Sequence, residues 1–420
     1  MGKNNFAQIE FCDYKGNEKL RKAPDSWRNY CGERVDNFAP KNVYDRKYLQ
    51  GFDIDFARFP VVVIETDDWG CCTRILETPD DLDKVFAVLR SIRGADGLPV
   101  VCTAFTCVSN PDYKKIKKNN YRRYYDLVLD EGFPEPWNGS GILDKMREGM
   151  REGIWHPEYH ALLHHQSPRL WLQFLRGTGP QSDYARERFE KGFFSQKYHI
   201  AEYGAYTARE QFEIIKTGIG YFERLFGYSP RAAVTSDAYP ETVLLWSVCG
   251  IDTVSLVNAK LNDGTPTVYN TKPWNFQDIY APMGAIGASS TVVYLGRNAG
   301  FELGESADAA WAAICRAWQN ANEPAVISCH RAGMIEDDGH LAAFGSLLKH
   351  AADSGAVFAS STDLGNLYRQ GWFVRQGVLH KYAECSCPVK TGISLTDGTE
   401  VKITKKTLGN FKIQKVISYE

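Results

Sequence analysis

The stretch VVVIETDDW, from Val61 to Trp69, decides the fold class of this 420-residue chain. Its first six residues, Val61 to Thr66, form a short apolar run rich in β-branched residues, which is typical of a strand buried in a sheet. The stretch DDLDKVFAVLRSI (residues 80–92) then has apolar residues at helical spacing, and Thr78 is a candidate N-cap for it. A buried strand followed by an amphipathic helix predicts a parallel sheet with right-handed crossovers.

The same alternation continues along the chain. Further strands are expected at residues 99–105, 152–156, 231–236, 251–256, 290–295, 323–330 and 355–360. Helical patterns stand between several of them, at residues 211–226, 241–249, 306–320 and 340–352. Seven or eight such units predict an α/β fold, specifically an irregular (β/α) barrel of seven or eight strands.

The composition changes at both ends of this region. Residues 1–57 are polar and predict an irregular N-terminal arm, whereas residues 58–370 carry the barrel pattern. Residues 371–420 predict a small β appendage, because Asp397-Gly398 stands between two alternating segments as a hairpin turn would.

Two insertions interrupt the barrel pattern, at residues 110–140 and 177–207, and both are candidate loops over a site. The first contains KKIKKNNYRRYY (residues 114–125). This basic run is interpreted as a solvated face, with a rim for an anionic ligand as the alternative.

Overall charge and hydropathy exclude several classes of protein. Lys plus Arg is 49 against 51 for Asp plus Glu, and this balance argues against a broad nucleic-acid-binding surface. No apolar run reaches the roughly eighteen residues that a membrane helix needs. The N-terminal residues lack an apolar core, so no secretory signal is expected. The 11 cysteines are an odd number without paired CxxC spacing, which favours a reducing cytoplasm over a disulfide scaffold.

The first chemical signal is the pair Asp67-Asp68 at the end of the first strand. Two adjacent carboxylates at the end of a buried strand are costly unless something pairs them. The carboxyl ends of barrel strands are also where active sites gather. One carboxylate could bind a cation while the other acts as a base; a helix N-cap or turn acid is the alternative.

The second signal is a histidine cluster in EGIWHPEYHALLHH, residues 152–165. His156 and His160 are four apart, a spacing that would place both rings on one face of a helical turn and let them share a metal. Local packing is an equally weighted alternative. His164 continues the same face, either behind the ligands or as a substrate contact.

The third signal is AVISCHRAGM, in which an apolar run delivers His330 at its carboxyl end, followed by Arg331. A lone histidine there would be interpreted as a core residue. Three such patterns at predicted strand ends are better explained together, as parts of one site.

At these residues the sequence resembles the polysaccharide deacetylases, the NodB-homology or carbohydrate esterase family 4 group. Glu65-Thr66-Asp67-Asp68 is similar to the family's first motif, Thr/Ser-x-Asp-Asp, with the Thr shifted. Residues 156–160 (HPEYH) keep both histidines of the second motif, and residues 327–330 (ISCH) resemble the late histidine motif. The resemblance covers roughly residues 58–368.

The resemblance implies a barrel fold, a set of metal ligands and a set of catalytic groups. Asp68, His156 and His160 would hold one divalent metal, with zinc first and cobalt, manganese or nickel as other candidates. The implied catalytic residues are Asp67 as the base and His330 as the acid that protonates the leaving amine.

Two further implied roles rest on segments that depart from the family pattern. Arg231 in SPRAAVTSDAYP would orient the catalytic Asp, although the Pro of that motif is absent. Asp278 would orient the acid histidine. A backbone N–H near Tyr239 would stabilise the oxyanion.

Substrate contacts are expected from aromatic and polar groups beside these motifs. Trp69 and Trp155 directly flank the motifs and either stack on sugar rings or pack in the core. Arg331 is a further expected contact. Residues 297–302 (RNAGFE) form either a substrate-contacting loop or a plain turn.

Three functions remain open from the sequence. The first is a metal-dependent hydrolase that removes an N-acetyl or O-acetyl group from a carbohydrate, a bacterial polysaccharide or its precursor. The second is a hydrolase of another non-peptide C–N bond in a small cytosolic metabolite. The third is a non-catalytic glycan-binding barrel. The sequence predicts a carbohydrate partner, no nucleic acid, no membrane span and a cytoplasmic location.

Overall fold

The computed structural model describes residues 54–164, 167–194, 202–203, 206–234, 240–256, 285–286, 292–382, 390–396, 400–408 and 411–419. The predicted N-terminal arm lies outside these ranges except for its last four residues, 54–57.

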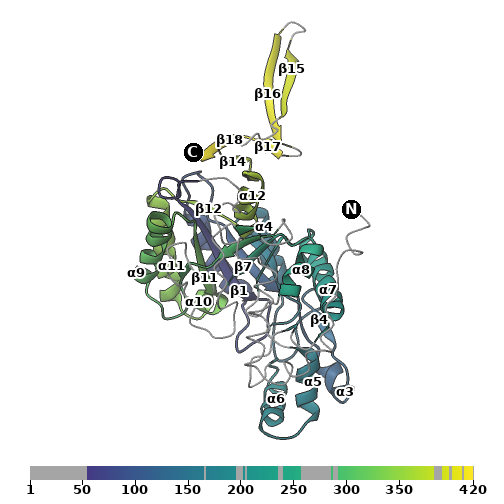
Figure 1. Cartoon of the computed structure of the whole chain (residues 1–420). Helices are drawn as coiled ribbons and strands as arrows, with labels where there is room; N and C mark the ends of the chain where they lie inside the picture. Colours follow the sequence, from purple (N-terminus) through teal and green to yellow (C-terminus); the bar gives the residue numbers. More distant parts are fainter. Residues whose placement is uncertain are drawn as a thin grey trace.

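The centre of the fold is one curled, mostly parallel sheet (Figure 1). Its strands are β1 (Val61–Trp69), β2 (Cys102–Cys107), β5 (Trp155–Ala161), β6 (Ala232–Val234), β7 (Thr253–Leu256), β8 (Ala285–Ile286), β9 (Val293–Gly296), β10 (Ala299–Gly300), β11 (Ala325–His330) and β12 (Val357–Ala359). In the described part of the chain the order is β10-β11-β1-β2-β5-β6-β7-β9, all parallel, with β8 antiparallel to β9. This half-barrel confirms the predicted (β/α) barrel class.

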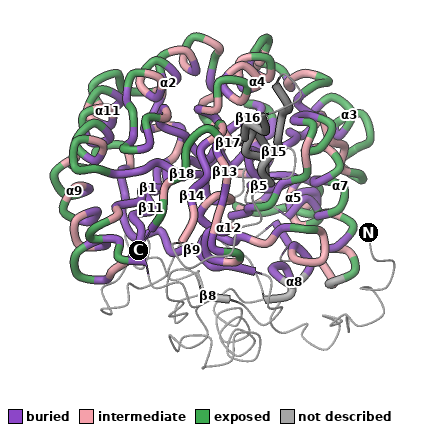
Figure 2. Tube along the Cα trace, turned by 90° about the horizontal axis from the view of Figure 1, so that it is seen from above, coloured by how far each residue is buried: buried purple, intermediate pink, exposed green. Residues whose placement is uncertain are grey.

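The first strand is central and buried on both faces. Val61 to Ile64 are at most 1% exposed, as expected for a β-branched run inside a parallel sheet. β1 pairs with β11 on one edge, and on the other with β12 and then, from Ile64 onward, with β2. Figure 2 shows the buried trace concentrated in these strands and the exposed residues on the surrounding helices.

Helices surround the sheet and cover it on several sides (Figure 1). They are α2 (Pro79–Ser91), α3 (Tyr113–Lys118), α4 (Ile142–Glu152), α5 (Pro168–Arg176), α6 (Pro180–Glu190), α7 (Ala208–Phe226), α8 (Pro240–Val248), α9 (Ala307–Arg316) with a π-helical extension η6 (Ala317–Ala321), α10 (Arg331–Ile335), α11 (Asp338–Asp353) and α12 (Ser361–Gln370). Helix α11 packs against α9, α2 and α10, and α7 packs against α8 and β5. None of the helices in the described ranges is long and apolar enough to cross a membrane.

Several helix starts follow directly from the local sequence. The Thr78 hydroxyl accepts a hydrogen bond from the Asp81 backbone N–H, and the Asp81 carboxylate accepts one from the Thr78 backbone N–H, which confirms the predicted cap of α2. Helices α7 and α12 begin with the same capping box, at Thr207 and Ser360.

The two predicted insertions contain regular structure as well as loops. The first includes the short strands β3 (Ser109–Pro111) and β4 (Asp126–Val128), which pair with each other, and helix α3. The second includes α6. Figure 1 shows α3, α5 and α6 together at the lower end of the molecule.

Two small sheets follow the barrel, as the sequence predicts. One contains β13 (Trp372–Arg375), β14 (Val378–Tyr382) and β18 (Lys415–Tyr419); the other contains β15 (Lys390–Thr396), β16 (Glu400–Leu408) and β17 (Phe411–Ile413). The turn residues Asp397-Gly398 lie outside the described ranges, but the antiparallel pairing of β15 with β16 is the predicted hairpin. This hairpin extends away from the barrel in Figure 1.

Candidate functional site

A bulge at the end of β1 brings two consecutive carboxylates to one place. In a regular strand, neighbouring side chains point to opposite faces of the sheet. Here Thr66 pairs with Ala104 and Trp69 pairs with Thr106. Between these two pairs β1 advances by three residues and β2 by only two, so β1 contains one extra residue. Asp68 also has a φ of 76°, a left-handed conformation that non-glycine residues rarely adopt. The bulge therefore redirects the chain at Asp67-Asp68.

Asp68 contacts two histidines from the end of β5. The Oδ1 atom of Asp68 lies 3.1 Å from His160 Nε2 and 2.5 Å from His164 Nε2. The three ligand atoms lie within 4.8 Å of one another, and this is the group in the described residues that could hold a metal ion. Burial alone would raise the pKa of Asp68, but the charge of His164 and hydrogen bonds from both histidines hold it well below its usual range.

The donor set fits a divalent transition metal. The Nδ1 atom of His160 lies 2.9 Å from the backbone carbonyl of Val234, which holds a proton on Nδ1, so a metal would take the place of the Nε2 proton that now faces Asp68. Two imidazoles and one carboxylate leave further coordination positions for water and substrate. Several first-row metals accept such ligands, so the residues do not select one metal.

The structure does not bring His156 to this cluster, which corrects the expected ligand set. Residues 155–161 form a strand, so positions 156 and 160 are about 13 Å apart along it, not one helical turn apart. His156 instead pairs in register with Thr103, and its Nε2 lies 3.0 Å from Glu158 Oε1. His164, expected behind the ligands or as a substrate contact, lies in the candidate metal-binding group in place of His156.

Asp67 is held by Arg297, a residue that sequence reasoning placed only in a possible substrate loop. The two terminal nitrogens of Arg297 donate to the two oxygens of Asp67, at 2.6 Å each, and Arg297 Nε donates to Glu65 at 2.7 Å. Burial alone would raise the pKa of Asp67, but the charge and hydrogen bonds of Arg297 lower it. Asp67 is therefore a fixed, ionised carboxylate beside the Asp68 cluster.

Arg231 does not take the orienting role expected for it. Its side chain is 44% exposed and forms an ion pair with Asp252, with Arg231 Nε 3.0 Å from Asp252 Oδ2. Arg297 has the expected contact instead. Arg297 could have been identified from its position directly after the predicted strand that becomes β9, because that strand ends at the same edge of the sheet as β1.

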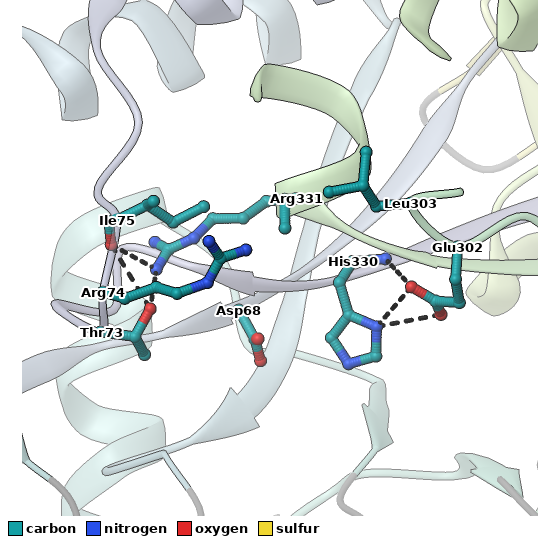
Figure 3. Close-up of a pocket in the computed structure, with 9 residues that line it drawn as sticks. Asp68, Thr73, Arg74, Ile75, Glu302, Leu303, His330 and Arg331 are labelled. Atoms are coloured by element: carbon teal, nitrogen blue, oxygen red, sulfur yellow. Dashed lines mark hydrogen bonds and ion pairs between the residues drawn. The ribbon is translucent and has the colours of Figure 1, made fainter. Parts of the chain in front are cut away.

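His330 ends β11 and is oriented by Glu302. His330 Nδ1 lies 2.9 Å and 3.0 Å from the two oxygens of Glu302, and the His330 backbone N–H also donates to Glu302 (Figure 3). His330 Nε2 lies 4.0 Å from Asp67 Oδ2. Burial lowers the pKa of His330, but the Glu302 hydrogen bond and the charges of Asp68, Glu302 and Asp67 raise it to about 9. Asp278, expected in the Glu302 role, lies outside the described residues.

Most residues that the sequence predicts as substrate contacts are buried or lie outside the described residues. Trp69 and Trp155 are 0% and 2% exposed and pack edge to face with their ring centres 4.7 Å apart, so both are core residues. Arg331 is buried and donates to Glu77 at 2.6 Å. Tyr239 lies outside the described residues.

A cavity of about 300 Å³ opens beside Asp68 and His330 (Figure 3). The loop after β1 lines one side of it with Thr73, Arg74 and Ile75, and Leu303 lines the side next to His330. A ligand in this cavity would contact a candidate metal ligand and an acidic imidazolium at once.

Comparison with known proteins found weak likenesses in structure alone. No family model matches the sequence, and no curated protein matches it. A family 4 carbohydrate esterase from Streptomyces lividans in complex with acetate shares 10% identity, covers 72% of this chain and 91% of its own, and gives a TM-score of 0.32. A peptidoglycan deacetylase from Bacillus subtilis shares 11% identity over 75% of this chain and 94% of its own, also with a TM-score of 0.32.

A CE4 family pseudoenzyme from Bacillus anthracis shares 10% identity over 73% of this chain and 66% of its own, with a TM-score of 0.33. These solved structures belong to the polysaccharide deacetylase group that the sequence motifs resemble. At such TM-scores the likeness assigns no function to this chain.

Proposed function

We propose that this protein is a metal-dependent hydrolase that removes an acetyl group from the nitrogen of an N-acetylated carbohydrate. One observation carries the proposal: ionised Asp67 lies beside both the Asp68–His160–His164 cluster and the imidazole of His330. Base, metal ligands and acid are thus at one end of the sheet. The carbohydrate class comes from the motif resemblance of Asp67-Asp68, His160 and His330.

Asp67 is the base of the proposed reaction. Its carboxylate is kept ionised by Arg297 and takes a proton from the attacking water. A divalent cation held by Asp68, His160 and His164 would supply Lewis-acid polarisation of the amide carbonyl. Because both oxygens of Asp67 are hydrogen-bonded by Arg297, the carboxylate is positioned before substrate arrives.

His330 is the acid of the proposed reaction. An amine leaves poorly as an anion, so its nitrogen must be protonated as the C–N bond breaks. Glu302 occupies Nδ1 of His330, which leaves Nε2 on the Asp67 side to donate the proton. With a pKa of about 9, the imidazole carries that proton at neutral pH.

The first test is metal binding, since the structure and the sequence motifs name different ligands. We expect His164→Ala to weaken zinc or cobalt binding by more than about a hundredfold in a chelator competition. We expect His156→Ala to change it less than about threefold, because His156 contacts Glu158 instead. Equal losses in both variants would contradict the Asp68–His160–His164 site.

The second test is acetate release by the metal-loaded protein from N-acetylglucosamine oligomers. Asp67→Asn should lower kcat by about 10²- to 10⁴-fold while the metal content stays the same. An exposed control, Asp130→Asn, should change neither. Metal binding without release of acetate from any N-acetylated sugar would refute the proposal and favour a glycan-binding barrel; release of amines only from small amides would favour the metabolite hydrolase.

A further inference from the structure

The cavity beside Asp68 and His330 carries an exposed positive charge on one wall. Two arginines line it, Arg74 and Arg331. Arg331 is 1% exposed and its guanidinium donates to Glu77 Oε2, Thr73 Oγ1 and the carbonyl oxygens of Cys71 and Ile75. The Arg331 guanidinium therefore stabilises the loop after β1, and the carboxylate of Glu77 balances its charge.

Arg74 is placed differently. Its side chain is 65% exposed, and its guanidinium lies 2.7 Å from the carboxylate of Glu336, at the end of α10. Exposed ion pairs of this kind contribute little to stability, because solvent competes for both partners. A ligand carboxylate could therefore replace Glu336 on Arg74 at small cost.

The opposite side of the cavity is apolar at its rim. Leu303 is 41% exposed, and of the large hydrophobic residues in the described part of the chain only Val416 is exposed in the same way. In Figure 3, Thr73, Arg74 and Ile75 lie on one side, and Leu303, Glu302 and His330 on the other, with Asp68 between them in this view. A ligand spanning the cavity would meet the guanidinium at one end and the apolar Leu303 beside the acid His330.

We propose that Arg74 selects substrates that carry a carboxylate on the acylated sugar ring, that is, acidic N-acetylated sugars. The inference rests on the proposed function and names its substrate class. The Nη2 atom of Arg74 lies 2.7 Å and 2.8 Å from the two oxygens of Glu336, so this guanidinium already accepts a carboxylate as its partner. A phosphate dianion would place more negative charge next to Glu302 and Glu336.

The test uses three sugars that differ at carbon 6: N-acetylglucosaminuronic acid, N-acetylglucosamine and N-acetylglucosamine 6-phosphate. Acetate release by the metal-loaded full chain gives kcat/KM for each. We expect the uronic acid to be preferred over the neutral sugar about tenfold or more. Arg74→Ala should lower kcat/KM for the uronic acid by about 10- to 100-fold and leave kcat/KM for the neutral sugar unchanged.

Two further variants separate recognition from a structural role. Glu336→Gln removes the competing carboxylate and should lower KM for the acid, the opposite of the effect of Arg74→Ala. Lys84→Ala removes a comparable exposed ion pair, Lys84 with Asp338 at 2.8 Å, outside the cavity and should change neither substrate. Parallel losses in Arg74→Ala and Glu336→Gln, equal losses on acid and neutral sugars, or a preference for the phosphate would overturn the inference.

Binding without turnover keeps the two proposals distinct. The same three sugars are titrated calorimetrically into wild type and Arg74→Ala. Tighter binding of the acid that is lost in Arg74→Ala supports the role of Arg74 even where no acetate is released, in which case only the hydrolase proposal fails. Equal binding of acid and neutral sugar overturns the role of Arg74.

Discussion

Arg297 is a fully buried side chain that serves two carboxylates. It donates to Asp67 and to Glu65, and Glu65 also accepts hydrogen bonds from Ser255 at 2.5 Å and Ser361 at 2.7 Å. A buried charge is tolerated only where such partners satisfy it. The base of the proposed reaction is thus part of a network that also joins β1 to β7, to α12 and to the residue that follows β9.

The first prediction concerns this network. Arg297→Ala should lower the free energy of unfolding by about 3–5 kcal/mol, because it leaves two buried carboxylates without their cation. Arg231→Ala removes an exposed Arg–Asp pair of the same chemistry and should cost about 1 kcal/mol or less. Urea denaturation of both variants measures the difference. A cost for Arg231→Ala equal to that for Arg297→Ala would show that the Asp67 network does not depend on Arg297.

The second prediction concerns pH. His330 must be protonated to act as the acid, so kcat should fall as pH rises through its pKa of about 9. The Glu302 hydrogen bond helps to raise that pKa, so Glu302→Gln should move the alkaline limb of the kcat profile to lower pH. An alkaline limb that stays in place in Glu302→Gln would assign the acid to another group.

At the scale of elements, the sequence predicts the alternation of core strands with helices, but not the extent of β5 or where strands bulge. The sequence pattern His-x-x-x-His is compatible with both a helix and a strand. Only the pairing with β2 shows that residues 155–161 are extended. The register of β5 against β2 also shifts around His160. Such shifts depend on the partner strand, so no local pattern reports them.

The charged partners of the site were missed for a related reason. Arg297 and Glu302 lie in a segment whose sequence is compatible with an ordinary turn. Their contacts with Asp67 and His330 arise because parallel strands end at one edge of the sheet, over sequence separations of 230 and 28 residues. Asp67, Asp68 and His330 could be predicted because each ends or directly follows a recognisable strand, whereas His160 was selected by its spacing from His156 on an expected helical turn.

The third prediction tests the bulge. Gly70 follows it with a φ of 76°, and a Cβ there would lie 2.8 Å from the carbonyl oxygen of Cys107. Gly97 has a similar φ of 83° but open space around the position of a Cβ. Gly97→Ala should therefore cost about 1–2 kcal/mol for the left-handed backbone alone, and Gly70→Ala distinctly more.

Chemical denaturation of the two glycine variants compares them directly, because both add the same methyl group to the same type of backbone. Metal titration of Gly70→Ala adds a second readout, since Asp68 lies two residues away. Equal costs and an unchanged metal affinity would mean that the close approach to Cys107 does not hold the Asp68 turn in place.

At the scale of the whole molecule, the C-terminal sheet is anchored at the end of the barrel opposite the site. Asp96 lies in the loop that leads into β2, and Asp67 lies where β1 ends. The Oδ2 atom of Asp96 lies 3.4 Å from both His380 Nε2 and Arg375 Nη2, and His380 Nδ1 lies 2.9 Å from the Tyr419 hydroxyl. These buried contacts join β13, β14 and β18 to the barrel.

The last prediction follows from that separation. Asp96→Ala leaves Arg375 buried without its carboxylate, so the free energy of unfolding should fall by about 3–5 kcal/mol. Because this anchor lies away from Asp68, metal affinity measured below the unfolding transition should stay within about twofold of wild type. Lys84→Ala, which breaks an exposed pair with Asp338, is the control for both measurements. A metal affinity that falls together with stability in Asp96→Ala would show that the sheet of β13, β14 and β18 shapes the site. A loss of stability with unchanged metal affinity would show that this sheet only stabilises the opposite end of the barrel.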